Sequence, residues 1–384
     1  AGTRDAIAIS TELNDIGVSL STSVERDGSR LGMTVLTKHL DKAMEIFGDI
    51  VTKPHFSAED WGRVTDLWYT QLERRADNPA AVASVVRNAA LYGPDTPYGH
   101  PSSGLLDTAK AITLDDAKRH YADVYRPDQA VIVVVGDVNR ERLDELLESH
   151  LGGWIKPSTP PPPRGSAPEP LTSRPEVIVV DRPDAPQSVV ALCAPGIKAS
   201  DPSAPLLDLV NAALGGSFTS RLNQNLREDH GWTYGARSSF VETRGVGTFV
   251  ASAAVFTKVT AAALREMVRE IDDIAKDGLT ATELDKVRAQ DLTDMIQTNE
   301  TVGGLSSRLL DLALLDLPPD FDAAASKKRQ AARAEQLASL AQAHLDTKRM
   351  TIVVVGPKDQ VVPQLRALDR GQPVLWTPEG QPVR

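Results

Sequence analysis

Two stretches of the chain repeat one another. Residues 125–136 (YRPDQAVIVVVG) and residues 345–356 (LDTKRMTIVVVG) align without a gap at a spacing of 220 residues. Each is preceded by a helical pattern, which starts at Thr113 in the first copy and at Ala334 in the second, and each is followed by another. A strand-centred unit that occurs twice predicts two homologous domains, which restricts the fold more than any other feature.

A proline-rich stretch, with the run PSTPPPPRG near its start, separates the two copies. Proline removes backbone donors and favours extended geometry, so we interpret residues 156–176 as a stiff linker; a docking ligand for an aromatic groove is the alternative. We therefore predict a first domain over residues 1–155 and a second over residues 177–384. At the spacing of 220, the counterpart of Val177 would precede residue 1, so the first domain is expected to lack its opening strands and helix.

The first copy mixes strand and helix patterns. Residues 18–24 alternate apolar and polar side chains, and Asp27-Gly28 is a turn signal before a returning strand. Residues 40–51 then carry apolar side chains at helical spacing. The apolar run Val131–Val135 is too short to span a membrane, and we interpret it as a buried strand.

The second copy predicts strands at residues 177–180, 187–193, 233–242 and 247–255, the last two as a pair. Apolar residues over 264–274 mark a long amphipathic helix, and Thr280 with Glu283 form a capping box for the next helix. Hairpins mixed with runs of helices predict an α+β fold: two homologous domains, each an antiparallel sheet covered by helices.

Charge and composition narrow the class of partner. The net charge is −10, without long blocks of one sign, and a nucleic-acid ligand would require a basic face. The single cysteine, Cys193, lies in an apolar run and is interpreted as a buried hydrophobic residue. No apolar stretch is long enough for a membrane span, and no signal peptide is recognised. The first residue is not methionine, so we expect that an upstream segment has been removed.

The sequence contains no recognisable metal site. None of the seven histidines has a second histidine three or four residues away, and there is no CxxC pair; the histidines are His39, His55, His100, His120, His150, His230 and His344. Nucleophile-elbow and phosphate-loop motifs are also missing from the sequence.

One stretch, residues 214–235 (LGGSFTSRLNQNLREDHGWTYG), could carry chemistry. The adjacent glycines Gly215 and Gly216 allow the backbone to approach a ligand or a neighbouring segment closely. Arg227 ends a short helix, and Tyr234 lies on the strand that follows. A guanidinium group and a phenol hydroxyl that converge could bind a peptide carbonyl and its developing charge. The alternative is a surface arginine and a tyrosine at the edge of the core.

This stretch resembles the second-domain motif of peptidase family M16, the insulinase and pitrilysin-like metallopeptidases. Further matching motifs are YGPDTPYGHP at residues 92–101, YRP at residues 125–127 and VVVGD at residues 133–137. In that family, an Arg and a Tyr seven residues apart contribute to the substrate site, and the resemblance assigns these roles to Arg227 and Tyr234. The small-residue loop before them matches Gly215, Gly216 and Ser217, which we assign to substrate binding.

The chain departs from active members of the family. Their HxxEH motif lies on a helix of the first domain, and that region would precede residue 1. The third zinc ligand is a Glu, and counting back from Asp77-Asn78-Pro79 places Gln71 at its position. A neutral amide is a poor substitute for a carboxylate on zinc, and Glu73, two residues on, points in another direction on a helix.

The resemblance therefore implies a metallopeptidase component that lacks zinc and is inactive alone. A homologous half or subunit would supply zinc, a peptide would be the substrate, and the reaction would be attack of a zinc-bound water on a peptide carbonyl. The rival is a structural subunit resembling the core proteins of respiratory complexes. A third interpretation, a homodimer deprived of its own zinc helix, is disfavoured by Gln71. The bacterial periplasm and the cytoplasm are both consistent with the sequence.

Overall fold

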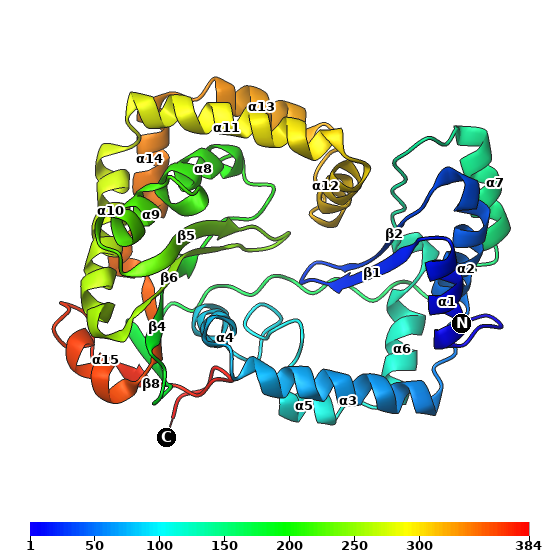
Figure 1. Cartoon of the computed structure of the whole chain (residues 1–384), viewed down its shortest axis with the longest axis horizontal. Helices are drawn as coiled ribbons and strands as arrows, with labels where there is room; N and C mark the ends of the chain where they lie inside the picture. Colours follow the sequence, from blue (N-terminus) through cyan, green and yellow to red (C-terminus); the bar gives the residue numbers. More distant parts are fainter. Residues whose placement is uncertain (384) are drawn as a thin grey trace. The chain divides into compact units, whose positions relative to one another are not determined.

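The computed structural model describes residues 1–383 and confirms the α+β class. The chain forms two compact units (Figure 1). The first contains residues 1–71, 106–165 and 297–313, and the second contains residues 72–105, 166–296 and those from 314 onward. Neither unit is one continuous stretch of chain. The division into sequence domains at residues 156–176 stays a prediction, and no helix or strand occurs between Leu151 and Val177.

The first unit is mostly helical. Its helices are α1 (Ala6–Asp15), α2 (Leu40–Thr52), α3 (Ala58–Arg75), α5 (Leu106–Lys110), α6 (Leu114–Val124), α7 (Arg140–Leu151) and α12 (Val302–Leu314), with the 3-10 turns η1 (Thr37–His39) and η2 (Pro127–Gln129). Side-chain hydrogen bonds cap several of these helices: Asp5 accepts from Ala8 N in α1, Thr113 and Asp116 form a capping box in α6, and Asn139 accepts from Arg142 N in α7. α3 extends to Arg75, so its last turn lies in the second unit.

The predicted hairpin of the first copy is confirmed. Strands β1 (Ser19–Val24) and β2 (Ser29–Thr34) pair antiparallel, from Ser19 opposite Thr34 to Val24 opposite Ser29. A small core of Leu13, Val18 and Ile46 anchors it to α1 and α2. A two-stranded sheet alone is marginally stable in water, so this packing is what holds the hairpin.

The prediction of a buried strand at residues 131–135 is wrong. The segment belongs to no strand, and Val131, Ile132 and Val134 are 62%, 48% and 42% exposed. An extended segment needs neighbouring strands to satisfy its backbone groups and to cover its side chains. Within residues 1–383, no strand pairs with this segment.

The second unit is built on a six-stranded sheet, with the strand order β5-β6-β4-β7-β3-β8. The strands are β3 (Val177–Asp181), β4 (Gln187–Pro195), β5 (Thr233–Val241), β6 (Thr248–Phe256), β7 (Thr351–Gly356) and β8 (Val374–Leu375). From β5 to β7 the neighbours are antiparallel, but β3 runs parallel to β7 and to β8. The sheet is therefore mixed, whereas a fully antiparallel sheet was expected.

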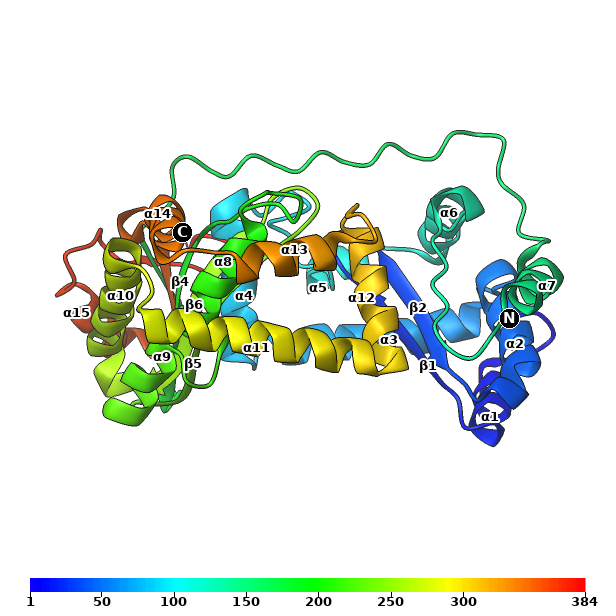
Figure 2. The same cartoon turned by 90° about the horizontal axis from the view of Figure 1, so that it is seen from above.

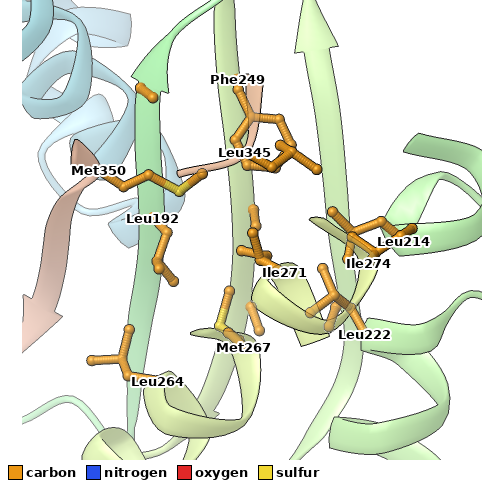
Figure 3. Packing of buried hydrophobic residues seen from close by; sticks show 14 of the residues in the cluster. Leu192, Leu214, Leu222, Phe249, Leu264, Met267, Ile271, Ile274, Leu345 and Met350 are labelled. Atoms are coloured by element: carbon orange, nitrogen blue, oxygen red, sulfur yellow. The ribbon is translucent and has the colours of Figure 1, made fainter. Parts of the chain in front are cut away.

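Helices cover one face of this sheet (Figures 1 and 2). They are α8 (Ala204–Asn211), α9 (Arg221–Asn223), α10 (Thr260–Asp277), α14 (Ala334–His344) and α15 (Lys358–Leu365), with the 3-10 turns η5 (Thr257–Val259) and η6 (Thr347–Arg349). Only the first turns of α11 (Ala281–Glu300) reach the same core, and α13 (Phe321–Gln330) packs against α8. In Figure 3, Met267 and Ile271 of α10 lie over Leu192 and Phe249 of the sheet. The capping box of Thr280 and Glu283 at the start of α11 is confirmed.

The opposite face of the sheet packs against α4 (Pro79–Tyr92). Its alanine and valine side chains lie against β4 and β7, where Cys193 is buried, as predicted. The Tyr92 hydroxyl donates a hydrogen bond to the Gly247 carbonyl oxygen. No helix in residues 1–383 has both the length and the apolar character required to cross a bilayer.

The spacing of 220 residues recurs among the observed elements. It relates η1 to η5, α6 to α14 and η2 to η6 without a shift at either end. It also relates α4 to the region of α12, and these two helices are exchanged: α4 belongs to the second unit and α12 to the first.

Candidate functional site

The glycine pair lies at the end of a π-helical turn, η3 (Ala212–Gly216), that follows α8. Gly215 is buried, and a Cβ there would be 2.4 Å from the backbone nitrogen of Ser238 in β5. A Cβ on Gly216, which is exposed, would be 2.8 Å from Asn211 Nδ2. Glycine therefore allows this turn to pack tightly against the edge strand, which gives Gly215 a packing role. Whether Gly215, Gly216 and Ser217 bind substrate stays a prediction.

Tyr234 lies on a β-bulge of the edge strand β5. Thr233 pairs with Val255 and Ala236 with Ala253, so Tyr234 and Gly235 together face one residue of β6. The Thr233 hydroxyl closes the bulge by accepting from Gly235 N and donating to Gly235 O. Bulges redirect side chains, and here the Tyr234 ring is 88% exposed beside the buried Thr233 and Ala236. The phenol hydroxyl is consequently presented to solvent from a fixed backbone.

Arg227 lies in a second π-helical turn, η4 (Gln224–Asp229), directly after α9. Its side chain is half-buried, and its guanidinium carbon lies 4.4 Å from the centroid of the Phe218 ring. Arg227 Nε is also 3.4 Å from a carboxylate oxygen of Glu228. π-helical turns are rare and occur frequently at functional sites. The guanidinium group of Arg227 thus has an aromatic ring and a carboxylate as neighbours.

Asn223 joins the two parts of the site. Its side-chain nitrogen donates to the carbonyl oxygen of Phe218 at 2.6 Å, and its side-chain oxygen accepts from the backbone N–H of Ala236 at 3.2 Å. Asn223 is only 4% exposed, so these bonds form in a low-dielectric environment. One carboxamide thus connects the loop that carries Phe218 to the strand that carries Tyr234.

Sequence patterns predicted Arg227 and Tyr234 as site residues but did not indicate Phe218 or Asn223. The structure brings Arg227 to Phe218, and it links the Phe218 loop to β5 two residues after Tyr234. Direct convergence of Arg227 and Tyr234 on one ligand stays a prediction. An aromatic residue between a Gly-Gly-Ser turn and a helix start was the available signal for Phe218. A buried asparagine has no comparable pattern.

Two polar clusters attach the helical run formed by α9 and η4 to the neighbouring helices. Arg221 makes two hydrogen bonds to the Glu283 carboxylate and one to the Gly278 carbonyl. Asn225 donates to Glu266 and Glu270 on α10. Burial alone would raise the pKa of Glu283, but hydrogen bonds from Arg221 and Thr280 outweigh it and lower the pKa to about 2. The helix is therefore fixed to α10 and α11.

The residues that the structure describes offer no donor set that fits a zinc ion. Residues 1–383 contain no cluster of three His, Cys, Asp or Glu side chains that could hold a metal. Gln71 and Glu73 are both exposed on α3. We therefore assign no chemical step to a metal bound by this chain.

Two family profiles match the sequence. The profile for the insulinase peptidase family M16 covers residues 1–96, and that for the peptidase M16 inactive domain covers residues 111–290. The chain belongs to peptidase family M16. The matches fall in both copies of the repeat, which agrees with the family that the Arg227 and Tyr234 motif resembles.

Individual relatives share about a quarter of the aligned residues or fewer with this chain. An uncharacterized zinc protease of Mycobacterium bovis is 26% identical over 285 residues, which are 73% of this chain and 64% of the relative. A non-peptidase homolog of Helicobacter pylori is 22% identical over 93% of this chain and 82% of its own length. The chain thus spans less than two thirds of the mycobacterial relative's length.

Solved structures share the fold. A peptidase M16 inactive domain from Pseudomonas fluorescens matches with a TM-score of 0.84 at 24% identity, covering 92% of this chain and 85% of that one. A chain of complex III2 from Candida albicans matches with a TM-score of 0.76 at 14% identity, covering 93% and 88%. The same M16 fold therefore occurs in a protein described as an inactive peptidase domain and in a respiratory complex.

Proposed function

We propose that this chain is the substrate-binding, zinc-free half of an M16 metallopeptidase. A homologous half or subunit would supply the metal that activates water for attack on a peptide carbonyl. This chain would contribute Arg227, Tyr234 and part of the wall of the substrate cavity. By itself it is expected to bind no zinc stoichiometrically and to cleave no unstructured peptide.

The observation that carries the proposal is the exposed Tyr234 on a closed β-bulge. An 88% exposed tyrosine near the start of a strand contributes little to packing, and the bulge fixes its backbone. A phenol hydroxyl held in this way can donate a hydrogen bond to a carbonyl oxygen as negative charge develops on it. Preorganised donors of this kind act mainly in the transition state.

Arg227 has a different role in the proposal. A guanidinium group provides several N–H donors in a fixed plane and is charged at every relevant pH. With the Phe218 ring beneath it, the group can bind the backbone carbonyls of an extended peptide. Such contacts exist before the reaction begins, so they hold the substrate rather than lower the barrier.

The experiment is reconstitution with a zinc-bearing M16 partner and measurement of peptide cleavage. Tyr234→Phe keeps the ring and removes the hydroxyl, so kcat should fall by on the order of 10²–10³ with little change in KM. Arg227→Ala should raise KM as well. Tyr125→Phe is the control, because Tyr125 is also an exposed tyrosine but lies in the first unit. If the double variant Arg227→Ala, Tyr234→Phe supports the same rate of cleavage as the unsubstituted chain, the assignment of these residues to the substrate site is refuted.

A structural or assembly subunit is the second candidate. The match to a chain of complex III2 and the relative named a non-peptidase homolog favour it. In that case the chain would form a stable complex with its partner, and both substitutions would leave assembly and function unchanged. Co-purification of the complex, with and without peptidase activity, separates the two candidates.

A further inference from the structure

The loop between the glycine pair and α9 carries a large exposed apolar side chain. Phe218 is 68% exposed, yet the backbone on both sides of it is held. Ser220 N donates to Ser217 O across the turn, and Asn223 donates to the Phe218 carbonyl oxygen. The ring is therefore presented to solvent on a restrained loop, beside Arg227 and on the same unit as Tyr234.

Phe218 and Asn223 link the two proposed site residues through a series of contacts. The Phe218 ring lies under the guanidinium group of Arg227. The Phe218 carbonyl is bound by Asn223, whose other end binds Ala236 N next to the Tyr234 bulge. A change at Asn223 would thus loosen the Arg227 side of the site relative to the Tyr234 side.

We propose that Phe218 and Asn223 are positioning residues of the peptide site: Phe218 orients the Arg227 guanidinium, and Asn223 fixes the Phe218 loop to β5 beside Tyr234. This inference rests on the proposed function. Neither residue needs to touch the scissile bond. Their effect reaches the substrate through Arg227, so their loss should affect binding more than the chemical step.

The chemistry of each contact predicts a graded series. An aromatic face attracts a guanidinium group through its quadrupole, and an aliphatic side chain of similar size does not. Phe218→Leu and Phe218→Ala should therefore raise KM about two- to fivefold, with kcat nearly unchanged. Phe218→Tyr keeps the ring and should behave as the unsubstituted chain. Because the side chain is mostly exposed, none of these variants should unfold the protein.

Asn223 requires a matched control, since a buried side chain also contributes to stability. Asn223→Ser removes the carboxamide that joins the loop to the strand. Asn225→Ser removes an equally buried carboxamide from η4, the turn that directly follows α9, but that group binds Glu266 and Glu270 on α10. Both variants should lower the melting temperature, whereas only Asn223→Ser should raise KM for peptide.

The test combines kinetics and spectroscopy on the full chain. Steady-state cleavage of β-casein, an unstructured polypeptide, is measured in the reconstituted pair, and the Nε–Hε signal of Arg227 is recorded for the chain alone in a proton–nitrogen correlation spectrum. The Phe218 ring current should displace that signal, and Phe218→Leu and Asn223→Ser should move it toward the position of an unstacked arginine. Phe218→Tyr and Asn225→Ser should leave it in place.

The outcomes separate this inference from the proposed function. If Arg227→Ala and Tyr234→Phe impair cleavage but Phe218→Leu and Asn223→Ser do not, the positioning roles are wrong and the function stands. If the Arg227 signal is unaffected by Phe218→Leu, the positioning role of Phe218 is refuted without reference to cleavage. If Arg227→Ala itself leaves cleavage unchanged, both proposals fall.

Discussion

Residues 132–136 and 352–356 have the same sequence, Ile-Val-Val-Val-Gly, but different structures. The second lies in β7, between β3 and β4, with every residue buried. The first belongs to no strand, and Ile132 and Val134 are roughly half exposed. The difference lies in the neighbours and not in the segment. β7 has a hydrogen-bonded strand on each side, whereas residues 132–136 have none among the described residues. An apolar β-branched run indicates the capacity to form a strand, and pairing decides whether it does.

The helical turn and the strand that carry Arg227 and Tyr234 have counterparts in the first copy. In the first copy, α1 ends at Asp15, Gly17 has φ +68° and β1 begins at Ser19. In the second copy, the helix ends at Asp229, Gly231 has φ +63° and β5 begins at Thr233. Each of these three features in the second copy lies 214 residues after its counterpart in the first copy.

At this spacing, Leu13 corresponds to Arg227 and Leu20 to Tyr234. The two leucines belong to the small core that holds the first hairpin, whereas Tyr234 is exposed and Arg227 lies at the surface against Phe218. The same helix–glycine–strand unit thus joins its elements by apolar packing in one copy and presents polar groups in the other. The second copy also packs Leu222 and Leu226 into the core, and it adds the Arg221–Glu283 pair and the hydrogen bond from Ala236 N to Asn223.

The largest effect is expected from a charge placed in the two identical segments. Val354→Asp buries a carboxylate in the middle of the sheet without a partner, which should cost more than about 4 kcal/mol of unfolding free energy. Val134→Asp places the same charge on an exposed segment and should change stability by less than about 0.5 kcal/mol. Denaturant unfolding followed by circular dichroism measures both. Similar losses would mean that residues 131–135 are buried in solution.

A smaller effect is expected at the matched positions Leu13 and Arg227. Leu13 is 4% exposed in a small core, so Leu13→Ala should lower the unfolding free energy by about 2–3 kcal/mol. Arg227→Ala should change it by less than about 0.5 kcal/mol, because the side chain lies at the surface. Urea denaturation of the two variants tests the contrast. A large stability loss for Arg227→Ala would assign that residue to packing.

The Arg221–Glu283 pair belongs only to the second copy, since residue 63, which lies 220 positions before Glu283, is an arginine. The pKa of Glu283 falls from an ordinary 4.5 to about 2 on folding, so the ionised carboxylate stabilises the folded state above pH 4.5. This stabilisation should be lost progressively as the pH falls from 4.5 towards 2. We therefore expect the stability difference between the unsubstituted chain and Glu283→Gln to shrink over this window. Thermal melts at stepped pH values measure it, and a constant difference would contradict the role of the pair.

The smallest effect is expected at Gly17 and Gly231. Both have positive φ, and a Cβ at either position would meet no atom within 4 Å. Alanine at either site should therefore cost only the backbone strain, about 1 kcal/mol, and the two costs should be equal. Thermal denaturation of Gly17→Ala and Gly231→Ala provides the measurement. A clearly larger cost at Gly231 would show that the two turns are not equivalent.

The sequence predicted much of the second unit because its signals are local. The strands at residues 177–180 and 187–193, the pair around Arg244 and the capping box of Thr280 and Glu283 all occur as expected. Two results did not follow from local pattern: the parallel pairing of β3 with β7 and the exchange of α4 and α12 between the units. Both depend on contacts between residues far apart in the sequence.

By itself, the sequence determined the repeat, the α+β class and the stretch that carries Arg227 and Tyr234, because periodicity, turn residues and motif spacing are properties of neighbouring residues. Tertiary structure alone decided that one Ile-Val-Val-Val-Gly segment is a buried strand and the other is exposed, because burial depends on which strands lie beside it. It also decided that Phe218 lies under Arg227 and that Asn223 joins the loop to β5. The close packing of Gly215 against Ser238 was likewise decided by tertiary structure, because no pattern of apolar and polar residues encodes it.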